Sequence, residues 1–144
     1  MAVITGFDGG SRKNPNYEDV VAGKTDYAQA VRVIYNSETL SYQQLLDYYW
    51  RHIDPTVGNG QFCDKGHQYR SVIFYLDKKQ KDIAFITKRE MEKRFNKVYT
   101  EVLPSTQFYA ADGEQQAYSQ RHPIWYRYYL FHCGQNKRIS ELWL

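Results

Sequence analysis

The residues whose types are most able to take part in a reaction lie in the segment 61–75, QFCDKGHQYRSVIFY. Cys63 stands directly beside Asp64, and a cysteine thiolate is both a nucleophile and a redox-active group. An adjacent carboxylate raises the pKa of a thiol, whereas Lys65 and His67 would offset that effect in part. The residue types leave two interpretations open: Cys63 is a nucleophile, or it is a loop residue near a site whose nucleophile lies elsewhere.

The cysteine content restricts the class of protein. The two cysteines, Cys63 and Cys133, are far apart and form no C-x-x-C element or metal-ligand cluster, which disfavours a zinc site and a secreted disulfide scaffold. We therefore predict no metal, no cofactor and thiols that stay reduced, as in the cytosol. The opening MAVITGFDGG lacks the basic region of a signal peptide, and no stretch reaches the roughly 18 apolar residues of a membrane helix. A cytoplasmic protein that binds no membrane is expected.

Composition indicates one globular domain. The chain has 144 residues, of which 42% are hydrophobic and 24% charged, with a net charge of +3. Acidic residues interrupt the basic ones, as in TKREMEKR, which is typical of a solvated helix surface rather than a nucleic-acid site. The 14 tyrosines suit half-buried positions, where an apolar ring carries one hydroxyl donor. A basic, tyrosine-rich nucleic-acid binder is an alternative, but no RNP-like or glycine-rich phosphate element supports it.

Local patterns predict alternating strands and helices. Strands are expected over 1–7, 28–36, 71–76 and 98–104, separated by turn-rich segments at 8–19 and 54–66. A capping box of Ser41 and Gln44 should start one helix, and a second box of Asp77 and Gln80 should start a longer one. One short helix within 108–123 and an ordered, aromatic-rich tail complete the chain.

The inner faces of the two long helices follow from helical spacing. They are expected to include Leu45, Tyr48 and Tyr49 in the first helix and Ile83, Ile86 and Phe95 in the second. Strands separated by helices predict an α/β protein, an α+β sandwich built around a mixed sheet flanked by helices.

Three blocks of the sequence together carry a resemblance to a known family. They are GFDGGSRKNPNYEDVVAGKTDYAQAVRVIYN, SYQQLLDYYWRHIDPTVGNGQFCDKGHQYRSVIFY and FYAADGEQQAY. In this order they resemble the type A peptide methionine sulfoxide reductases, and the similarity extends to the C-terminal CGQNKRISELW. The resemblance implies a ferredoxin-like fold and reduction of the S epimer of methionine sulfoxide, free or in proteins. It also implies a thiol mechanism, with thioredoxin as the final reductant.

The resemblance assigns roles to individual residues. Tyr17 of NPNY and Tyr69 of QYRS match two tyrosines that bind the sulfoxide oxygen, and Asp64 matches an aspartate that helps to bind substrate. Gln29 occupies the position of the catalytic acid, a glutamate in most members. A glutamine can donate hydrogen bonds to a sulfoxide oxygen but cannot deliver a proton. Gln115 stands where a histidine is usual.

The family nucleophile belongs to a Gly-Cys-Phe-Trp element that precedes GFDGG, and no such element occurs in these 144 residues. We therefore expect a single domain over 1–144 that is N-terminally truncated and lacks the first strand and helix, which would expose a sheet edge and an apolar face. Cys63 is expected to be a loop residue and Cys133 a candidate resolving thiol. The alternative to an active reductase is a non-catalytic remnant that binds methionine sulfoxide.

Overall fold

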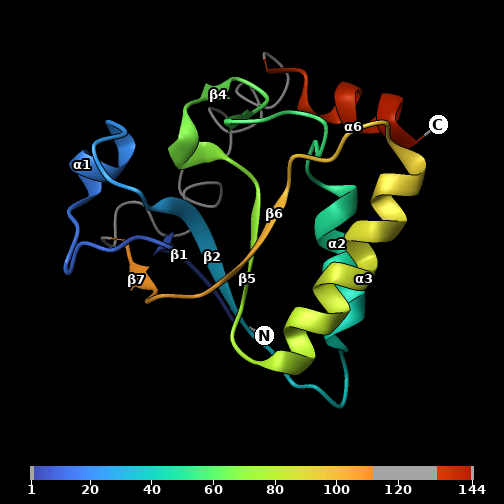
Figure 1. Ribbon diagram of the computed structural model, residues 1–144, viewed down its shortest axis with the longest axis horizontal. Coiled ribbons are helices and arrows are strands. Elements are labelled where there is room, and N and C mark those ends of the chain that lie inside the picture. The colour runs from blue at the N-terminus through green and yellow to red at the C-terminus, as the bar shows by residue number, and fades with distance from the viewer. Residues whose placement is uncertain (1, 112–132, 144) are drawn as a thin grey trace.

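The computed structural model of the chain describes residues 2–111 and 133–143 (Figure 1). Its elements, in chain order, are β1 (Ala2–Asp8), α1 (Tyr17–Val21), β2 (Ala28–Ile34), α2 (Tyr42–Arg51), β3 (Gly60–Gln61), β4 (Asp64–Lys65), the 3-10 helix η1 (His67–Tyr69), β5 (Val72–Tyr75), α3 (Lys78–Arg94), β6 (Glu101–Pro104), β7 (Tyr109–Ala110) and α6 (Gln135–Trp143). The expected α/β class is confirmed. The short helix expected within 108–123 lies mostly outside the described residues, as does Gln115.

Both long helices begin at the predicted caps. The Ser41 hydroxyl accepts a hydrogen bond from Gln44 N at 3.0 Å, and the Gln44 side chain accepts one from Ser41 N at 2.9 Å. Asp77 accepts from Gln80 N at 2.8 Å, but the Gln80 side chain accepts from Leu76 N instead of closing a reciprocal box. Helix α1 was not expected, although Asn16 caps it by accepting from Asp19 N at 2.8 Å.

The predicted inner faces of α2 and α3 are partly wrong. In α2 the buried residues are Leu46 and Trp50, whereas Tyr48 is 64% exposed and stacks on His52. In α3 the buried residues are Ala84 and Thr87, whereas Ile86 is 52% exposed. The indole of Trp50 donates a 3.0 Å hydrogen bond to the Thr87 hydroxyl, so a polar contact fixes the rotation of the two helices.

In the part of the chain that the structure describes, the strands form three small sheets, whereas one mixed sheet was expected. β2, β1 and β7 form an antiparallel sheet in that order, β3 and β4 form a hairpin, and β5 pairs with β6 in parallel. Among the described residues, β2 and β5 each pair with a strand on one side only. Val3, Val31 and Ile34 on β1 and β2 are more than half exposed.

Within residues 2–111 and 133–143, the buried side chains form two separate clusters. One cluster lies where α2 and α3 pack beside β5 and β6 (Figure 1). Its buried residues include Leu46, Trp50 and Ile73. Phe7, Val20 and Tyr27 form the other, between β1 and α1. Residues 2–111 and 133–143 contain no helix long and apolar enough to span a bilayer.

The end of β1 meets β5 at a glycine. Gly9 has φ of +84°, and a Cβ built on it would lie 2.5 Å from the ring of Phe74 in β5. Only glycine accommodates both the left-handed backbone and this close approach. Gly9, directly after β1, is therefore a point of close contact with β5.

Candidate active site

Tyr17, Asp64 and Tyr69 come together although they belong to three different elements. Tyr17 is the first residue of α1, Asp64 begins β4, and Tyr69 ends η1. Burial raises the pKa of the Tyr69 phenol, and the nearby charges of Asp64 and Tyr17 raise it further. The Tyr69 hydroxyl thus stays protonated at neutral pH and is available as a hydrogen-bond donor.

Gln29 lies on the side of the β1–β2 ladder that faces this cluster. It pairs with Phe7 across the two strands, and directly paired residues project from the same face of a sheet. The ring of Phe7 lies 6.1 Å from that of Tyr17, measured between centroids. Gln29 itself is exposed.

Gln68 and His67 tie the η1 segment that contains Tyr69 to the end of α1 and to the residues after it. The buried Gln68 amide donates a 2.7 Å hydrogen bond to Val21 O, and His67 Nε2 bonds to Thr25 O at 2.5 Å, which places a proton on Nε2. Gly23 leaves room for Gln68, because a Cβ there would lie 3.3 Å from the Gln68 amide oxygen. The sequence analysis missed both positioning residues, although both belong to the segment HQYR that it quoted.

Asp64 sits on a very short hairpin. β3 and β4 contribute only two residue pairs, Gly60 with Lys65 and Gln61 with Asp64, joined by a turn at Phe62 and Cys63. The 54–66 segment was expected to be irregular, and this hairpin is a correction. Outside the two pairs, Gly66 N donates to Asn59 O at 2.9 Å.

The expectation of reduced thiols is wrong. Cys63 and Cys133 form a disulfide, with 5.2 Å between their Cα atoms, across 70 positions of sequence. Cys63 occupies the hairpin turn, and Cys133 lies just before α6. Spacing could not reveal this pair, because proximity across the fold decides which cysteines meet.

An ion pair adds a second link between α6 and the same loop. Arg138 Nε donates to Asp54 Oδ2 at 2.9 Å, and Arg138 Nη2 donates to the Thr56 hydroxyl at 3.2 Å. Burial would raise the pKa of the Asp54 carboxyl, but hydrogen bonds from Arg138 and Thr56 outweigh it and lower that pKa below the usual 3.8. The Gln61 side chain accepts from Asp54 N and donates to Asp54 O, which joins β3 to this network.

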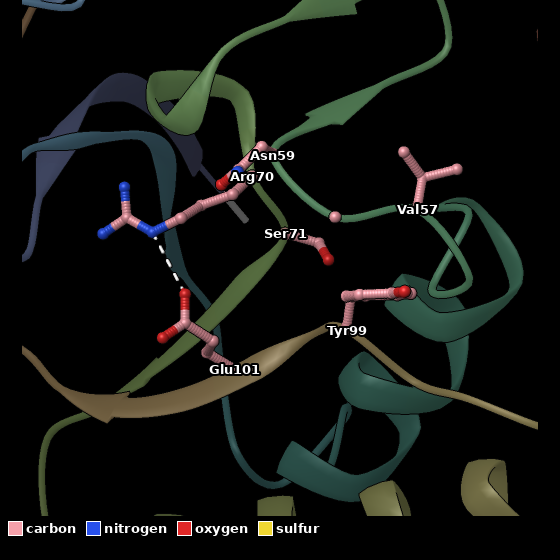
Figure 2. Close-up of a pocket in the computed structure, with 7 residues that line it drawn as sticks. Val57, Asn59, Arg70, Ser71, Tyr99 and Glu101 are labelled. Carbon is pink, nitrogen blue, oxygen red and sulfur yellow. Dashed lines mark hydrogen bonds and ion pairs between the residues drawn. The ribbon is translucent and has the colours of Figure 1, made fainter.

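A pocket of about 450 Å³ lies on the other side of the QYRS segment (Figure 2). Arg70 turns toward Glu101, 3.1 Å from Nε to Oε1, and Ser71, Tyr99 and Val57 also line the pocket. None of Tyr17, Gln29, Asp64 or Tyr69 lines it, so it is not the candidate active site. Among the described residues no group of His, Cys, Asp and Glu is arranged to hold a metal ion.

The family model for peptide methionine sulfoxide reductase matches residues 1–144. The chain belongs to the peptide methionine sulfoxide reductase family. It is 35% identical over 144 residues to peptide methionine sulfoxide reductase MsrA of Bacillus subtilis, a match that covers 98% of this chain and 81% of that protein. It is 37% identical over 145 residues to MsrA 2 of Caulobacter vibrioides, over 99% of this chain and 74% of that protein.

Solved structures of reductases agree with the fold of this family member. The reduced form of Mxr1 from Saccharomyces cerevisiae aligns with a TM-score of 0.78 and 32% identity, over 85% of this chain and 71% of that one. Methionine sulfoxide reductase A of Corynebacterium diphtheriae aligns with a TM-score of 0.78 and 28% identity, over 85% of this chain and 64% of that one. The resemblance inferred from the sequence blocks is therefore confirmed.

Proposed function

We propose that this chain acts on the S epimer of methionine sulfoxide, free or in proteins, at the site formed by Tyr17, Gln29, Asp64 and Tyr69. The chain is a peptide-methionine (S)-S-oxide reductase by family, and its reaction is the reduction of methionine sulfoxide to methionine. The observation that carries the site assignment is the convergence of Tyr17, Asp64 and Tyr69 from three elements.

The proposed roles follow from the polarity of a sulfoxide. Its oxygen carries partial negative charge, and the hydroxyls of Tyr17 and Tyr69 would donate hydrogen bonds to it, which makes the sulfur more electrophilic. Both phenols can fill this role at neutral pH, because a tyrosine hydroxyl is protonated there and can donate. Gln29 would add an amide donor, and Asp64 would orient the substrate. Since Gln29 cannot release a proton, water would protonate the departing oxygen.

The reaction takes two electrons from thiols. A thiolate attacks the sulfoxide sulfur and becomes a sulfenic acid as methionine leaves, and a second thiol condenses with that acid to give a disulfide and water. A dithiol must then restore the thiols, and we propose thioredoxin for this step. We also propose a single domain over 1–144 and a cytoplasmic location.

A second candidate function is binding of methionine sulfoxide without turnover. It is favoured by one observation, that the only two cysteines of the sequence are bonded to each other. Neither supplies a thiolate while that bond is intact.

Turnover of the S epimer with dithiothreitol separates the two functions. The R epimer is the substrate control, and the Cys63→Ser and Cys133→Ser variants test the two thiols. S-selective turnover that is lost in Cys63→Ser or Cys133→Ser would establish reduction by this chain. Saturable binding of the S epimer without turnover would establish the second function, and absence of both would contradict the site assignment.

A further inference from the structure

The hairpin that carries Asp64 has a register that its own strands specify only weakly. Its ladder consists of two residue pairs, Gly60 with Lys65 and Gln61 with Asp64, and none of these four residues has an apolar side chain. Burial of an apolar face is what fixes the register of most strands, and polar or glycine-containing strands slip more easily. A slip of one residue would turn Asp64 to the opposite face of the hairpin. The position of its carboxylate therefore depends on contacts outside the ladder.

The Gln61 side chain makes such a contact with the backbone of Asp54. Its amide oxygen accepts a 2.8 Å hydrogen bond from Asp54 N, and its amide nitrogen donates to Asp54 O at 2.7 Å and to Gly60 O at 2.8 Å. A glutamine amide has one oxygen and two N–H donors, so all of its donors and its acceptor are used here. A shift of β3 by one residue would break both bonds to Asp54.

The segment that receives Gln61 is itself fixed at two points. The Asp54 carboxylate binds Arg138 of α6, with 2.9 Å between Oδ2 and Nε. The next residue, Pro55, is fully buried, and its carbonyl accepts a 2.7 Å hydrogen bond from Tyr99 N just before β6. Gln61 therefore ties β3 to a part of the chain that cannot move with the hairpin.

The disulfide does not replace this contact. Cys63 lies in the turn of the hairpin and is bonded to Cys133. A cross-link at one turn residue fixes where the turn lies, but rotation about the cysteine side-chain bonds leaves the orientation of the two strands open. The bonds of Gln61 act on β3 itself, directly opposite Asp64 in the ladder.

We propose that Gln61 is a positioning residue, which fixes the register of the hairpin through Asp54 and so keeps the Asp64 carboxylate at the substrate site. This inference rests on the proposed function, in which Asp64 orients methionine S-sulfoxide. Because Gln61 acts through Asp64, the Gln61 amide should matter for binding only while the Asp64 carboxylate is present.

A double-mutant cycle tests the proposal on the whole, oxidised chain. Gln61→Met removes the amide at nearly constant length, and Gln61→Asn is a milder variant, one methylene too short to reach both backbone groups of Asp54. Asp64→Asn removes the charge, and Gln43→Met on the exposed side of α2 is the matched control. Urea unfolding shows that each variant is folded under the conditions of the assay.

The first measurement is affinity for N-acetyl-methionine-S-sulfoxide. We expect both Gln61 variants to bind about fivefold or more weakly than the wild type, and Gln43→Met to bind equally well. In the Asp64→Asn background, the same Gln61 changes should cause no further loss. A residue that only stabilised the fold would weaken binding in both backgrounds.

The second measurement needs no ligand. Burial raises the pKa of the Tyr69 phenol, and the nearby charge of Asp64 raises it further. Carbon-13 NMR of labelled tyrosine side chains follows this titration, and Tyr69→Phe assigns the signal. We expect both Gln61 variants to lower the pKa of Tyr69 toward its value in Asp64→Asn, with no change in Gln43→Met.

Three results would overturn the proposal: wild-type affinity in both Gln61 variants, a further loss of affinity when Gln61→Met is added to Asp64→Asn, or a pKa of Tyr69 that the Gln61 variants leave unchanged. The two measurements also separate this inference from the proposed function. If the pKa of Tyr69 responds as expected but the wild type binds neither epimer, Gln61 positions Asp64 and the proposed function fails.

Discussion

Arg138 Nε lies 2.9 Å from Asp54 Oδ2, and this ion pair joins α6 to the loop after α2 across 84 positions of sequence. The Asp54 side chain is only 4% exposed, whereas that of Arg138 is 41% exposed. A carboxylate buried to this extent needs a positively charged partner, because a buried charge without one strongly destabilises the folded chain. The docking of α6 and the conformation of the 54–66 loop therefore depend on each other.

Replacement of Arg138 by glutamine should destabilise the chain. Breaking a fully buried pair costs about 3–5 kcal/mol, and the partial exposure of Arg138 reduces the expected loss to about 1–3 kcal/mol. The free energy of unfolding in urea, measured under oxidising conditions, gives this value. Arg89→Gln, on the exposed side of α3, is the matched control and should change it by less than about 0.5 kcal/mol. Equal effects from the two variants would contradict a special role for Arg138.

The same pair predicts a dependence of stability on pH. The pKa of Asp54 is below its ordinary value of 3.8 in the folded chain, so its contribution is complete above that value and is lost as pH falls through the lower, folded pKa. We expect the stability difference between the wild type and Arg138→Gln to be constant from pH 7 to about 5 and to shrink below about 4. A difference that grows on acidification would show the opposite sign of linkage.

The Gln68 amide should be needed to position Tyr69. Gln68→Glu keeps the shape of the side chain but replaces the donor to Val21 O with an acceptor, and Gln68→Ala removes the contact altogether. Loss of a buried hydrogen bond costs about 1–3 kcal/mol, and both variants should lose stability of this order. Thermal or urea unfolding tests this, and a glutamate variant as stable as the wild type would show that the donor is unimportant.

Reduction of the disulfide should lower stability substantially. It closes a loop of about 70 residues, and the chain-entropy model assigns such a loop roughly 4 kcal/mol. Urea unfolding of the oxidised and reduced chain measures the difference, and the Cys63→Ser/Cys133→Ser variant should match the reduced chain. Equal stability of the oxidised and reduced forms would mean that the cross-link does not constrain the unfolded chain.

Local features of the fold could be predicted from the sequence because they depend on neighbouring residues. The caps at Ser41 and Asp77 and the strands at 2–8 and 28–34 arise from side chains within a few positions of each other. Helical spacing did not decide which side of α2 is buried, since tyrosines and apolar residues occur on more than one side. The packing of Trp50 against Thr87, a contact across 37 positions, decides it.

The proposed site residues Tyr17, Asp64 and Tyr69 came from the family resemblance, and Asp64 and Tyr17 influence the pKa of Tyr69 in the folded chain. The contacts that support these residues could not be predicted. The disulfide and the Arg138–Asp54 pair link the 54–66 loop to α6 and the residues just before it, and no local pattern in the sequence encodes such partners. Gln68 and His67 bond to the backbone carbonyls of Val21 and Thr25. Every residue has such a carbonyl, so the residue types at these two positions do not reveal the contacts.

The most direct test of the central claim, that Tyr17, Asp64 and Tyr69 bind a sulfoxide, is the affinity of the oxidised chain for the S and R epimers of N-acetyl-methionine sulfoxide. We predict a preference for the S epimer that falls by about 2–12-fold for each hydroxyl removed in Tyr17→Phe and Tyr69→Phe. It should be unchanged in Tyr48→Phe, whose hydroxyl lies on the exposed face of α2. Equal affinity for the two epimers, or a preference for the S epimer that survives loss of both hydroxyls, would contradict the account.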